Sequence, residues 1–176
     1  MKQEYRLPFQ SNIRIISQGY NGPYSHKIWK RHSINGTNIV NDDRFSVDFV
    51  CLPGTPVLAS RNGIVLTGDD TCSRYYNGEE FEKGIRFFPN FMILRHEDDS
   101  FSLYSHLKKD SIRVRQNQRV AKGQVIAETG LSGWIGRVPH LHFEAYNPPH
   151  GRRKSFPVVF EDFDGPLEHA GIAYLR

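Results

Sequence analysis

The chain has 176 residues, of which 38% are hydrophobic and 24% charged, and its formal net charge is +4 with an isoelectric point near 9.1. These values are typical of an ordinary globular protein with a buried core, and one domain over residues 1–176 is the expected organisation. No apolar run is long enough to span a membrane, and Met1–Arg6 contains no hydrophobic segment of signal-peptide type.

The positive charge is spread along the chain, apart from Arg113 with Arg115 and the run Arg152–Lys154. A mildly basic surface suits anionic surroundings such as a cell-wall polymer, but scattered charges favour a solvated surface over a nucleic-acid site. We therefore expect no nucleic-acid partner and no membrane span, and we favour a monomer. Cys51 follows an apolar strand and is expected to be a buried thiol, with a disulfide to Cys72 as the second interpretation.

Taken in chain order, the predicted elements are short strands. Glycine and proline recur at short intervals, the stretches between them are rich in β-formers, and no segment keeps a helical period. The predicted strands are Ile13–Ser17, Phe45–Val50, Pro56–Ala59, Gly63–Thr67, Phe91–His96, Phe101–His106, Gln124–Glu128 and Leu141–Tyr146. Short connections, such as a turn over Glu97–Ser100, favour antiparallel hairpins. The expected fold is all-β, a compact antiparallel sheet or sandwich.

Two predicted loops are longer than the others, Trp29–Asp43 and Asp69–Gly84. In a compact β-domain such loops tend to form the walls of a binding cleft, and variable surface decoration is the equal alternative. A C-terminal extension covers residues 147–176, in which Phe156–Phe160 predicts one more strand packed on the domain. The charged residues around that strand, including Arg152–Lys154, are expected to form a solvated surface.

The segment richest in chemical groups lies late in the chain. In a strand, alternate side chains share a face, so His140, His142 and Glu144 project one way. Leu141 and Phe143 then project into the core. Two imidazoles on one face of a rigid strand can bind a transition metal, or serve as one metal ligand and one acid–base group. Two surface histidines on an edge strand are the alternative.

A carboxylate lies inside another apolar segment. Asp48 is flanked by Val47 and Phe49, which face the other way if the segment is a strand. A carboxylate in such a setting is costly unless a metal or a cation pairs with it. Two interpretations therefore stand side by side: Asp48 is a metal ligand, or it forms an ion pair with Arg44, which alternation places on the same face.

Alternation along Phe101–His106 places Tyr104 and His106 on one face. An imidazole beside a tyrosine fits a general base or an oxyanion-stabilising donor, and a structural histidine is the alternative for His106 alone. The glycine-punctuated stretch Gly130–Gly136 then leads into the histidine strand. Because no helix is predicted to follow it, a flexible wall of a peptide groove fits this stretch better than a phosphate-binding loop.

These segments occur in an order that resembles the order of motifs in a known family. In chain order they are Ser46–Phe49, Pro53–Val57, Gly63–Val65, Tyr104–Leu107, Gly123–Ala127, Thr129–Gly130 and His140–Glu144. Each is a weak signal alone. The ordered set, with both histidine motifs, resembles the lysostaphin/LytM-type zinc metallopeptidases, which are peptidoglycan endopeptidases, over about residues 18–146.

The resemblance implies a LytM-type β-domain with a long groove and a tetrahedral zinc ion at its floor. In that family His142, the second histidine of the His-x-His motif, and Asp48, the aspartate of the first motif, would be zinc ligands. His140 and His106 would assist catalysis. The implied activity is hydrolysis of a peptide bond in peptidoglycan cross-links or stem peptides, and the implied location is extracytoplasmic. A degenerate, non-catalytic LytM-like domain that binds wall peptides or regulates a partner hydrolase is the alternative.

The chain departs from the family pattern at one position. A ligand histidine normally stands four residues before the aspartate, and this chain has Arg44 there, whose protonated guanidinium cannot ligate zinc. His26 is the predicted replacement, because some members of the family have a similar serine–histidine block upstream. His32 is the second choice, and Asp42 or Asp43 would serve if the loop folds over the site.

Overall fold

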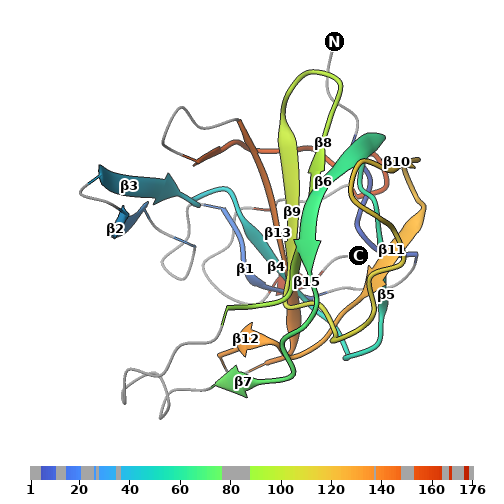
Figure 1. Ribbon diagram of the computed structural model, residues 1–176, viewed down its shortest axis with the longest axis horizontal. Coiled ribbons are helices and arrows are strands. Elements are labelled where there is room, and N and C mark those ends of the chain that lie inside the picture. Colours follow the sequence, from blue (N-terminus) through green and yellow to red (C-terminus); the bar gives the residue numbers. More distant parts are fainter. Residues whose placement is uncertain are drawn as a thin grey trace.

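The computed structural model describes residues 5–10, 15–20, 26, 28–34, 37–76, 88–136, 138–147, 153–163, 167 and 173–174. These residues form strands and no helix, which confirms the all-β prediction (Figure 1). The strands are β1 (Ile15–Gln18), β2 (Ile28–Ile34), β3 (Thr37–Asp42), β4 (Val47–Val50), β5 (Pro56–Leu58), β6 (Gly63–Asp69), β7 (Tyr75–Tyr76), β8 (Phe91–Arg95), β9 (Phe101–Ser105), β10 (Arg119–Val120), β11 (Val125–Glu128), β12 (Gly133–Trp134), β13 (His140–Asn147), β14 (Lys154–Ser155) and β15 (Ala173–Tyr174). Within the described part of the chain, nothing has the length and apolarity of a membrane-spanning helix.

One large sheet organises most of the strands. Its path runs β10-β6-β8-β9-β13-β14-β3-β2, and β4 joins it by pairing with β13 and with β1. Most pairings are antiparallel, as predicted, whereas β14 pairs with β3 in parallel and β12 pairs with β7 in parallel in a separate small sheet. Figure 1 shows β6, β8, β9 and β13 side by side in the middle of the molecule. β13 therefore has β9 along one edge and β4 along the other.

The core lies against one face of this sheet. Phe143 on β13 is paired with Tyr104 on β9 and with Val47 on β4, so the three side chains share that face. The ring of Phe143 packs against the rings of Tyr104, Tyr5 and Phe160, at centroid distances of 5.4, 6.4 and 5.7 Å. All of these side chains are buried, and each contributes roughly 1.5–3 kcal/mol to folding by leaving water. The opposite face of β13 is left for polar groups.

The prediction that Trp29–Asp43 is a loop is wrong, because β2 and β3 form an antiparallel hairpin there. Figure 1 shows this hairpin projecting from the side of the central sheet. The segment is polar and lacks regular alternation of apolar residues, so its sequence did not predict strands. Asn35-Gly36 between them is a hairpin-turn sequence and was the available clue, although these two residues lie outside the described part. Of Asp69–Gly84, residues 77–84 also lie outside it.

The strand predicted over Phe156–Phe160 is also wrong. The strand in this region, β14, ends at Ser155, immediately before it. Pro157 has no N–H to give to a sheet ladder, which disfavours a regular strand through the segment. The segment nevertheless contacts the rest of the protein, because Val158 and Phe160 are buried and Phe160 forms a single bridge with Tyr5.

The other predicted strands are present, with ends that differ by one or two residues. Residues 13 and 14 of the first predicted strand lie outside the described part. The hairpin turn over Glu97–Ser100 is confirmed, because the amide of His96 donates to the carbonyl of Ser100 at 2.8 Å. Cys51 and Cys72 are both free, and Cys51 is the buried thiol that was predicted.

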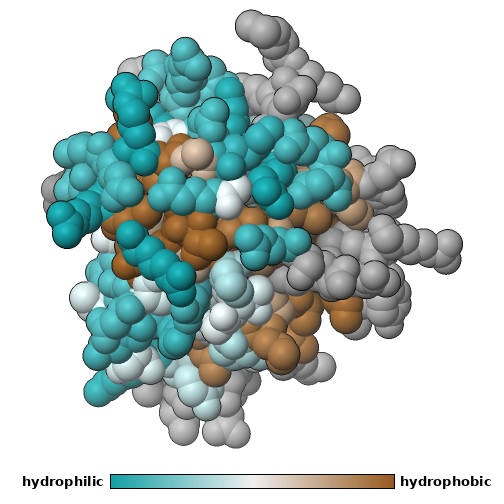
Figure 2. Space-filling view, turned by 90° about the vertical axis from the view of Figure 1, so that its right-hand side faces the viewer, coloured by the Kyte–Doolittle hydropathy of each residue, from teal (hydrophilic) through white to brown (hydrophobic). Residues whose placement is uncertain are grey.

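Hydrophilic residues cover most of the side of the molecule shown in Figure 2, with apolar residues gathered between them. Five large apolar side chains are exposed in or next to strands β4, β7, β8, β12 and β13. They are Leu52, Tyr75, Phe88, Trp134 and Val138.

Candidate metal centre

Strands β4, β9 and β13 bring the predicted groups together. His142 is paired across the sheet with Asp48 on β4 and with Ser105 on β9. Residues directly opposite one another share a face, so Asp48 lies on the same face of the sheet as His140 and His142. Val47, Phe49 and Phe143 occupy the other face and are buried in the core. The alternation predicted from the sequence is therefore present in both strands.

Asp48 is the centre of a cluster of histidines. Its Oδ1 lies 3.0 Å from Nδ1 of His142, and its Oδ2 lies 3.5 Å from Nε2 of His140 and 3.5 Å from Nε2 of His26. The carboxylate is nearly inaccessible to solvent, with 5% of its side chain exposed. The buried carboxylate of Asp48 thus has three imidazoles as its partners.

The donor set fits a zinc ion. His26, Asp48 and His142 each offer one ligand atom, and these atoms lie within 4.8 Å of one another. Ligands about 2.0–2.1 Å from a tetrahedral zinc lie about 3.3 Å apart, close to the separations around Asp48. The buried Nδ1 of His26 has no hydrogen-bond partner in the part of the chain that the structure describes. Two imidazoles and a carboxylate are also the number and type of ligands found at catalytic rather than structural zinc sites.

The electrostatics of the cluster favour ionised Asp48 and neutral His26, which are the forms that bind a metal, and the protonated form of His142. Burial alone would raise the pKa of Asp48, but His26, His140 and His142 hold that pKa well below its usual range. Burial lowers the pKa of His26 to about 4, against the opposing pull of Asp48. Burial would also lower the pKa of His142, but the carboxylates of Asp48 and Glu144 raise it to about 9. A metal would displace the proton of His142, since metal binding requires deprotonated ligands.

His106 and His140 form a second pair beside the cluster. Their ring centroids are 4.6 Å apart. Nδ1 of His106 lies 2.8 Å from the carbonyl oxygen of Ser132, and Nδ1 of His140 lies 2.9 Å from that of Val138. A carbonyl can only accept, so Nδ1 carries the hydrogen in both rings and Nε2 keeps its lone pair in the neutral form. Burial, with His140 nearby, lowers the pKa of His106 to about 3, which leaves it neutral, with a lone pair at Nε2.

His106 reaches the site by a route that alternation does not predict. Strand β9 ends at Ser105, and His106 has a left-handed backbone with φ of 66°. Such a conformation is uncommon for a residue other than glycine, and it breaks the alternation of faces. Tyr104 therefore does not lie beside His106, and that prediction is wrong. Its hydroxyl is in the core, where it accepts a hydrogen bond from the amide of Ser60 at 2.8 Å.

The loop Gly130–Gly136 carries one of the two carbonyls that hold these histidines, and sequence reasoning missed this role. The hydroxyl of Ser132 donates to the carbonyl of Leu107 and accepts from the amide of Asn90. The side chain of Asn90 is buried and bonds the same carbonyl of Leu107. Gly133 continues the loop into β12, which pairs with β7. The loop is thus tied to the segment that carries His106.

Arg44 takes no part in the cluster. Its guanidinium pairs with Asp42 at 2.8 Å, so the predicted alternative of an ion pair between Arg44 and Asp48 is wrong. Asp43 pairs with Arg153 at 2.9 Å, and neither Asp42 nor Asp43 belongs to the group of ligand atoms. The side chain of His32 lies outside the described part of the structure. Of the alternatives considered for the third ligand, His26 is the one that the structure places beside Asp48.

Glu144 lies next to His142 on the polar face of β13. Its side chain is fully buried, and its Oε2 is 3.9 Å from Nε2 of His142. Burial raises the pKa of Glu144, while His142 and Arg153 oppose that rise. Arg153, from the segment predicted to be a solvated surface, has 24% of its side chain exposed and approaches Glu144 at 3.3 Å. The prediction of a solvated arginine is therefore wrong.

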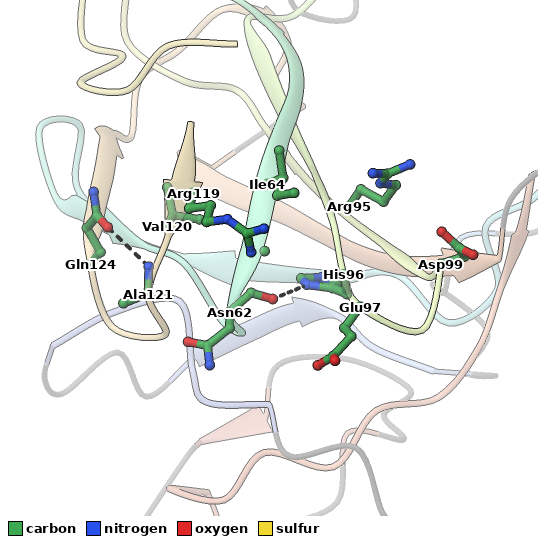
Figure 3. Close-up of a pocket in the computed structure, with 11 residues that line it drawn as sticks. Asn62, Ile64, Arg95, His96, Glu97, Asp99, Arg119, Val120, Ala121 and Gln124 are labelled. Atoms are coloured by element: carbon green, nitrogen blue, oxygen red, sulfur yellow. Dashed lines mark hydrogen bonds between the residues drawn. The ribbon is translucent and has the colours of Figure 1, made fainter. Parts of the chain in front are cut away.

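A spacious cleft in the described part of the molecule lies elsewhere. It measures about 800 Å³ and lies at the turn between β8 and β9, bordered by Arg95, Asp99 and Arg119 (Figure 3). Arg95 is at the far end of β8 from Phe91, which is paired with Ser105 beside the histidines. None of the clustered histidines borders this cleft, so the chemical groups rather than the size of the cleft locate the candidate site.

Comparison with known proteins points to the same region of the chain as the candidate site. A profile of Peptidase family M23 matches residues 43–155, which include Asp48, His106, His140 and His142 but not His26. The peptidoglycan DD-endopeptidase ShyA of Vibrio cholerae is 34% identical over 142 residues, which are 79% of this chain and 26% of ShyA. The murein hydrolase activator NlpD of Salmonella dublin is 40% identical over 98 residues, which are 56% of this chain and 22% of NlpD.

The chain spans about a quarter of the length of these two relatives. Among solved structures, the antimicrobial peptidase lysostaphin from Staphylococcus simulans superposes with a TM-score of 0.52 at 25% sequence identity. The superposition covers 84% of this chain and 50% of the lysostaphin chain. The arrangement of strands that carries the histidine cluster is therefore shared with a peptidase.

Proposed function

Because the chain belongs to peptidase family M23, we propose that it is a zinc-dependent endopeptidase that hydrolyses peptide bonds in bacterial peptidoglycan. One observation carries the proposal: a buried group of two histidines and an aspartate lies against a second pair of histidines, whose Nδ1 atoms are held by carbonyls and whose Nε2 atoms keep a lone pair in the neutral form. The ligands alone would bind a metal without providing for proton transfer. The adjacent acid–base pair is what a hydrolase requires in addition.

In this proposal His26, Asp48 and His142 hold the zinc ion. When bound, the ion supplies Lewis acidity, which polarises a scissile carbonyl and brings the pKa of a water molecule down to roughly 7. The remaining work falls to the side chains of this chain, which position the reacting groups and move the proton.

His140 is the better placed of the two histidines to act as general base. Its Nε2 lies 3.5 Å from the carboxylate of Asp48, which stabilises the imidazolium formed when Nε2 takes a proton from the attacking water. The carbonyl of Val138 holds Nδ1 and so fixes the tautomer. The proton then passes from Nε2 to the nitrogen of the leaving amine. Neutral His106, held by Ser132, orients the water by accepting a hydrogen bond at its own Nε2.

The proposed substrate is a peptide of the cell wall, in cross-links or in stem peptides. ShyA, which is similar to this chain over 79% of its length, is named as a peptidoglycan DD-endopeptidase. Three exposed apolar side chains lie on the chain within two residues of groups at the site and offer contacts for an extended peptide: Leu52 follows Val50, which pairs with His140, Trp134 follows Ser132, and Val138 precedes His140. Peptidoglycan lies outside the cytoplasmic membrane, so we propose an extracytoplasmic location.

A non-catalytic module that regulates a partner hydrolase is the second candidate. Two observations favour it: the similarity to the activator NlpD, and Arg44 at the position of a family ligand. Against it stand His106 and His140, which a binding module has no need to hold in an acid–base arrangement.

Digestion of purified peptidoglycan, with mass spectrometry of the released fragments, tests the proposal. We expect the protein to contain one zinc ion per chain and to release peptide fragments, and we expect chelation to abolish the release. His142→Ala should lose the zinc, and His140→Ala should retain zinc but lose most of the activity. Protein that folds without binding zinc, or that binds zinc yet releases no fragment and stimulates a wall hydrolase instead, contradicts the proposal.

A further inference from the structure

A carboxylate stands directly behind one of the proposed ligands. Glu144 follows His142 on the same face of β13, its side chain is fully buried, and its Oε2 lies 3.9 Å from Nε2 of His142. The other ring nitrogen of His142, Nδ1, faces Asp48 at 3.0 Å. If Nδ1 is the atom that faces the metal, then Nε2 carries the hydrogen and points to Glu144. A carboxylate at this position fixes the ring of a ligand histidine and increases its basicity.

Glu144 does not hold this position unaided. Neither of its carboxylate oxygens has a well-aligned hydrogen bond within the described residues. Its ionic partners there are His142 and Arg153, whose Nε approaches Oε1 at 3.3 Å. A fully buried carboxylate is costly when it lacks a nearby positive charge, and arginine supplies a charge that cannot be lost by deprotonation.

Arg153 is itself held from three sides. Its guanidinium donates to Oδ1 of Asp43 at 2.9 Å and lies over the ring of Tyr146, 5.5 Å from the centroid. The ring of Tyr146 stacks on that of Phe101 at 5.3 Å. The carbonyl of Arg153 accepts a hydrogen bond from the amide of Asp42 at 2.9 Å, which joins this segment to the end of β3. Such fixation is unusual for an arginine that serves only as a solvated surface charge.

We propose that Arg153 is a positioning residue for the metal centre, which holds the Glu144 carboxylate against Nε2 of His142 and thereby sets the affinity for the metal. The inference rests on the proposed function, because it takes His142 to be a metal ligand. It gives a role to a residue outside both histidine motifs. It also explains why Asp43, next to the position of the missing ligand histidine, pairs with an arginine rather than with the histidine cluster.

The first test measures zinc affinity, by competition with a chelating indicator, for the full chain and for Arg153→Met. We expect the affinity to fall about 10–100-fold, the usual effect of losing a partner behind a metal ligand. Arg153→Lys should recover part of the loss, because it restores the charge without the planar fork of the guanidinium.

Arg61→Met is the matched control. Arg61 has 20% of its side chain exposed, pairs with Asp98 at 2.9 Å and lies over the ring of Tyr5, so its surroundings resemble those of Arg153. It lies between β5 and β6, where it pairs with the turn between β8 and β9, away from the histidine cluster around Asp48. Its loss should lower the thermal stability to a similar degree and leave zinc affinity unchanged.

The second test asks whether Arg153 acts through Glu144. We expect Glu144→Gln to weaken zinc binding, and the double variant Glu144→Gln/Arg153→Met to bind zinc no more weakly than Glu144→Gln alone. The double variant removes the buried charge of Glu144 together with that of Arg153, and only Asp43 loses its partner, so it also serves if Arg153→Met alone folds poorly. The electronic spectrum of bound cobalt(II) should shift in Arg153→Met and not in Arg61→Met.

Each outcome has a distinct meaning. If Arg153→Met and Arg61→Met bind zinc as tightly as the unchanged chain, Arg153 is a structural residue and the inference is overturned. Additive losses in the double variant overturn its route through Glu144. If the unchanged chain binds no zinc, the proposed function itself fails. The zinc affinity of the unchanged chain, measured first, distinguishes this failure from a failure of the inference about Arg153.

Discussion

Asp48 and His142 are 94 residues apart in the sequence and directly opposite one another in the sheet, with Oδ1 of the first 3.0 Å from Nδ1 of the second. The antiparallel pairing of β4 with β13 fixes this approach, because it sets the register and the face of both side chains. The third group, His26, is not in either strand. The predictions below test the centre that these three residues form and the structure that supports it.

His26→Ala should weaken zinc binding by more than about 100-fold, because even the loss of a partner behind a ligand costs about 10–100-fold. His26 is the histidine that lies beside Asp48 without belonging to a family motif. His32→Ala is the matched control and should leave the affinity unchanged. Isothermal titration of the metal-free proteins with zinc measures both. Equal affinities in the two variants would exclude His26 as a ligand.

Gly133→Ala should lower kcat by about 100-fold while zinc content stays the same, since a displacement of about 1 Å at a catalytic group has an effect of this size. Gly133 has φ of +76°, and an added Cβ would lie 2.8 Å from Cβ of Pro89. The backbone must shift, and with it the carbonyl of Ser132 that holds His106.

Gly54→Ala separates this effect from backbone strain. Gly54 also has a positive φ, of +85°, but an added Cβ there meets nothing within 4 Å. Both variants should lose about 1–2 kcal/mol of stability for an L-residue in a left-handed conformation. Only Gly133→Ala should lose activity per folded molecule, and an equal loss of activity in both would refute the role of this carbonyl.

Tyr104→Phe should reduce the free energy of unfolding by about 1–3 kcal/mol, because the amide of Ser60 and the hydroxyl of Ser102 lose a buried partner. Tyr104 is in the core and not at the histidines, so the activity of the folded variant should equal that of the unchanged chain. Urea unfolding and peptidoglycan digestion measure the two quantities. A loss of activity with full stability would show a catalytic tyrosine instead.

His96→Gln should remove part of the acid sensitivity of folding. His96 is buried, with Nδ1 donating to the carbonyl of Asn62 and Nε2 bonded to Ser102, and burial lowers its pKa. The unfolded chain therefore binds a proton at higher pH than the folded one does. The stability from neutral His96 is fully present above about pH 6.5 and is lost as pH falls below that value, by up to about 1.4 kcal/mol per pH unit.

Urea unfolding of both proteins at about pH 7.5 and about pH 5.5 measures the difference, well above and below the ordinary histidine pKa. The unchanged chain should lose more stability between these two values than His96→Gln does. Because His96 lies far from the proposed metal ligands, metal-free protein is used for both. A parallel decline in the two proteins would show that His96 does not titrate in this range.

The sequence alone was sufficient for the features that depend on a period of two. The polar face of His140, His142 and Glu144 and the apolar face of Phe143 follow from strand alternation, and both are confirmed. The all-β fold and the lysostaphin/LytM-type family are confirmed as well. Alternation failed at His106, where a left-handed residue reverses the face, and at Pro157, which interrupts a predicted strand.

Tertiary structure decided which distant groups meet. The resemblance predicted His26 as the ligand that completes the group begun by His142, with His32 as the second choice, and the packing of the chain places His26 against Asp48. Nothing in the sequence pattern predicted that Arg153 faces Glu144 rather than solvent. Strand periodicity is local, so it can be recognised from neighbouring residues in the sequence. The distance between a ligand and its partner depends on strand register and chain path, which only the assembled sheet defines.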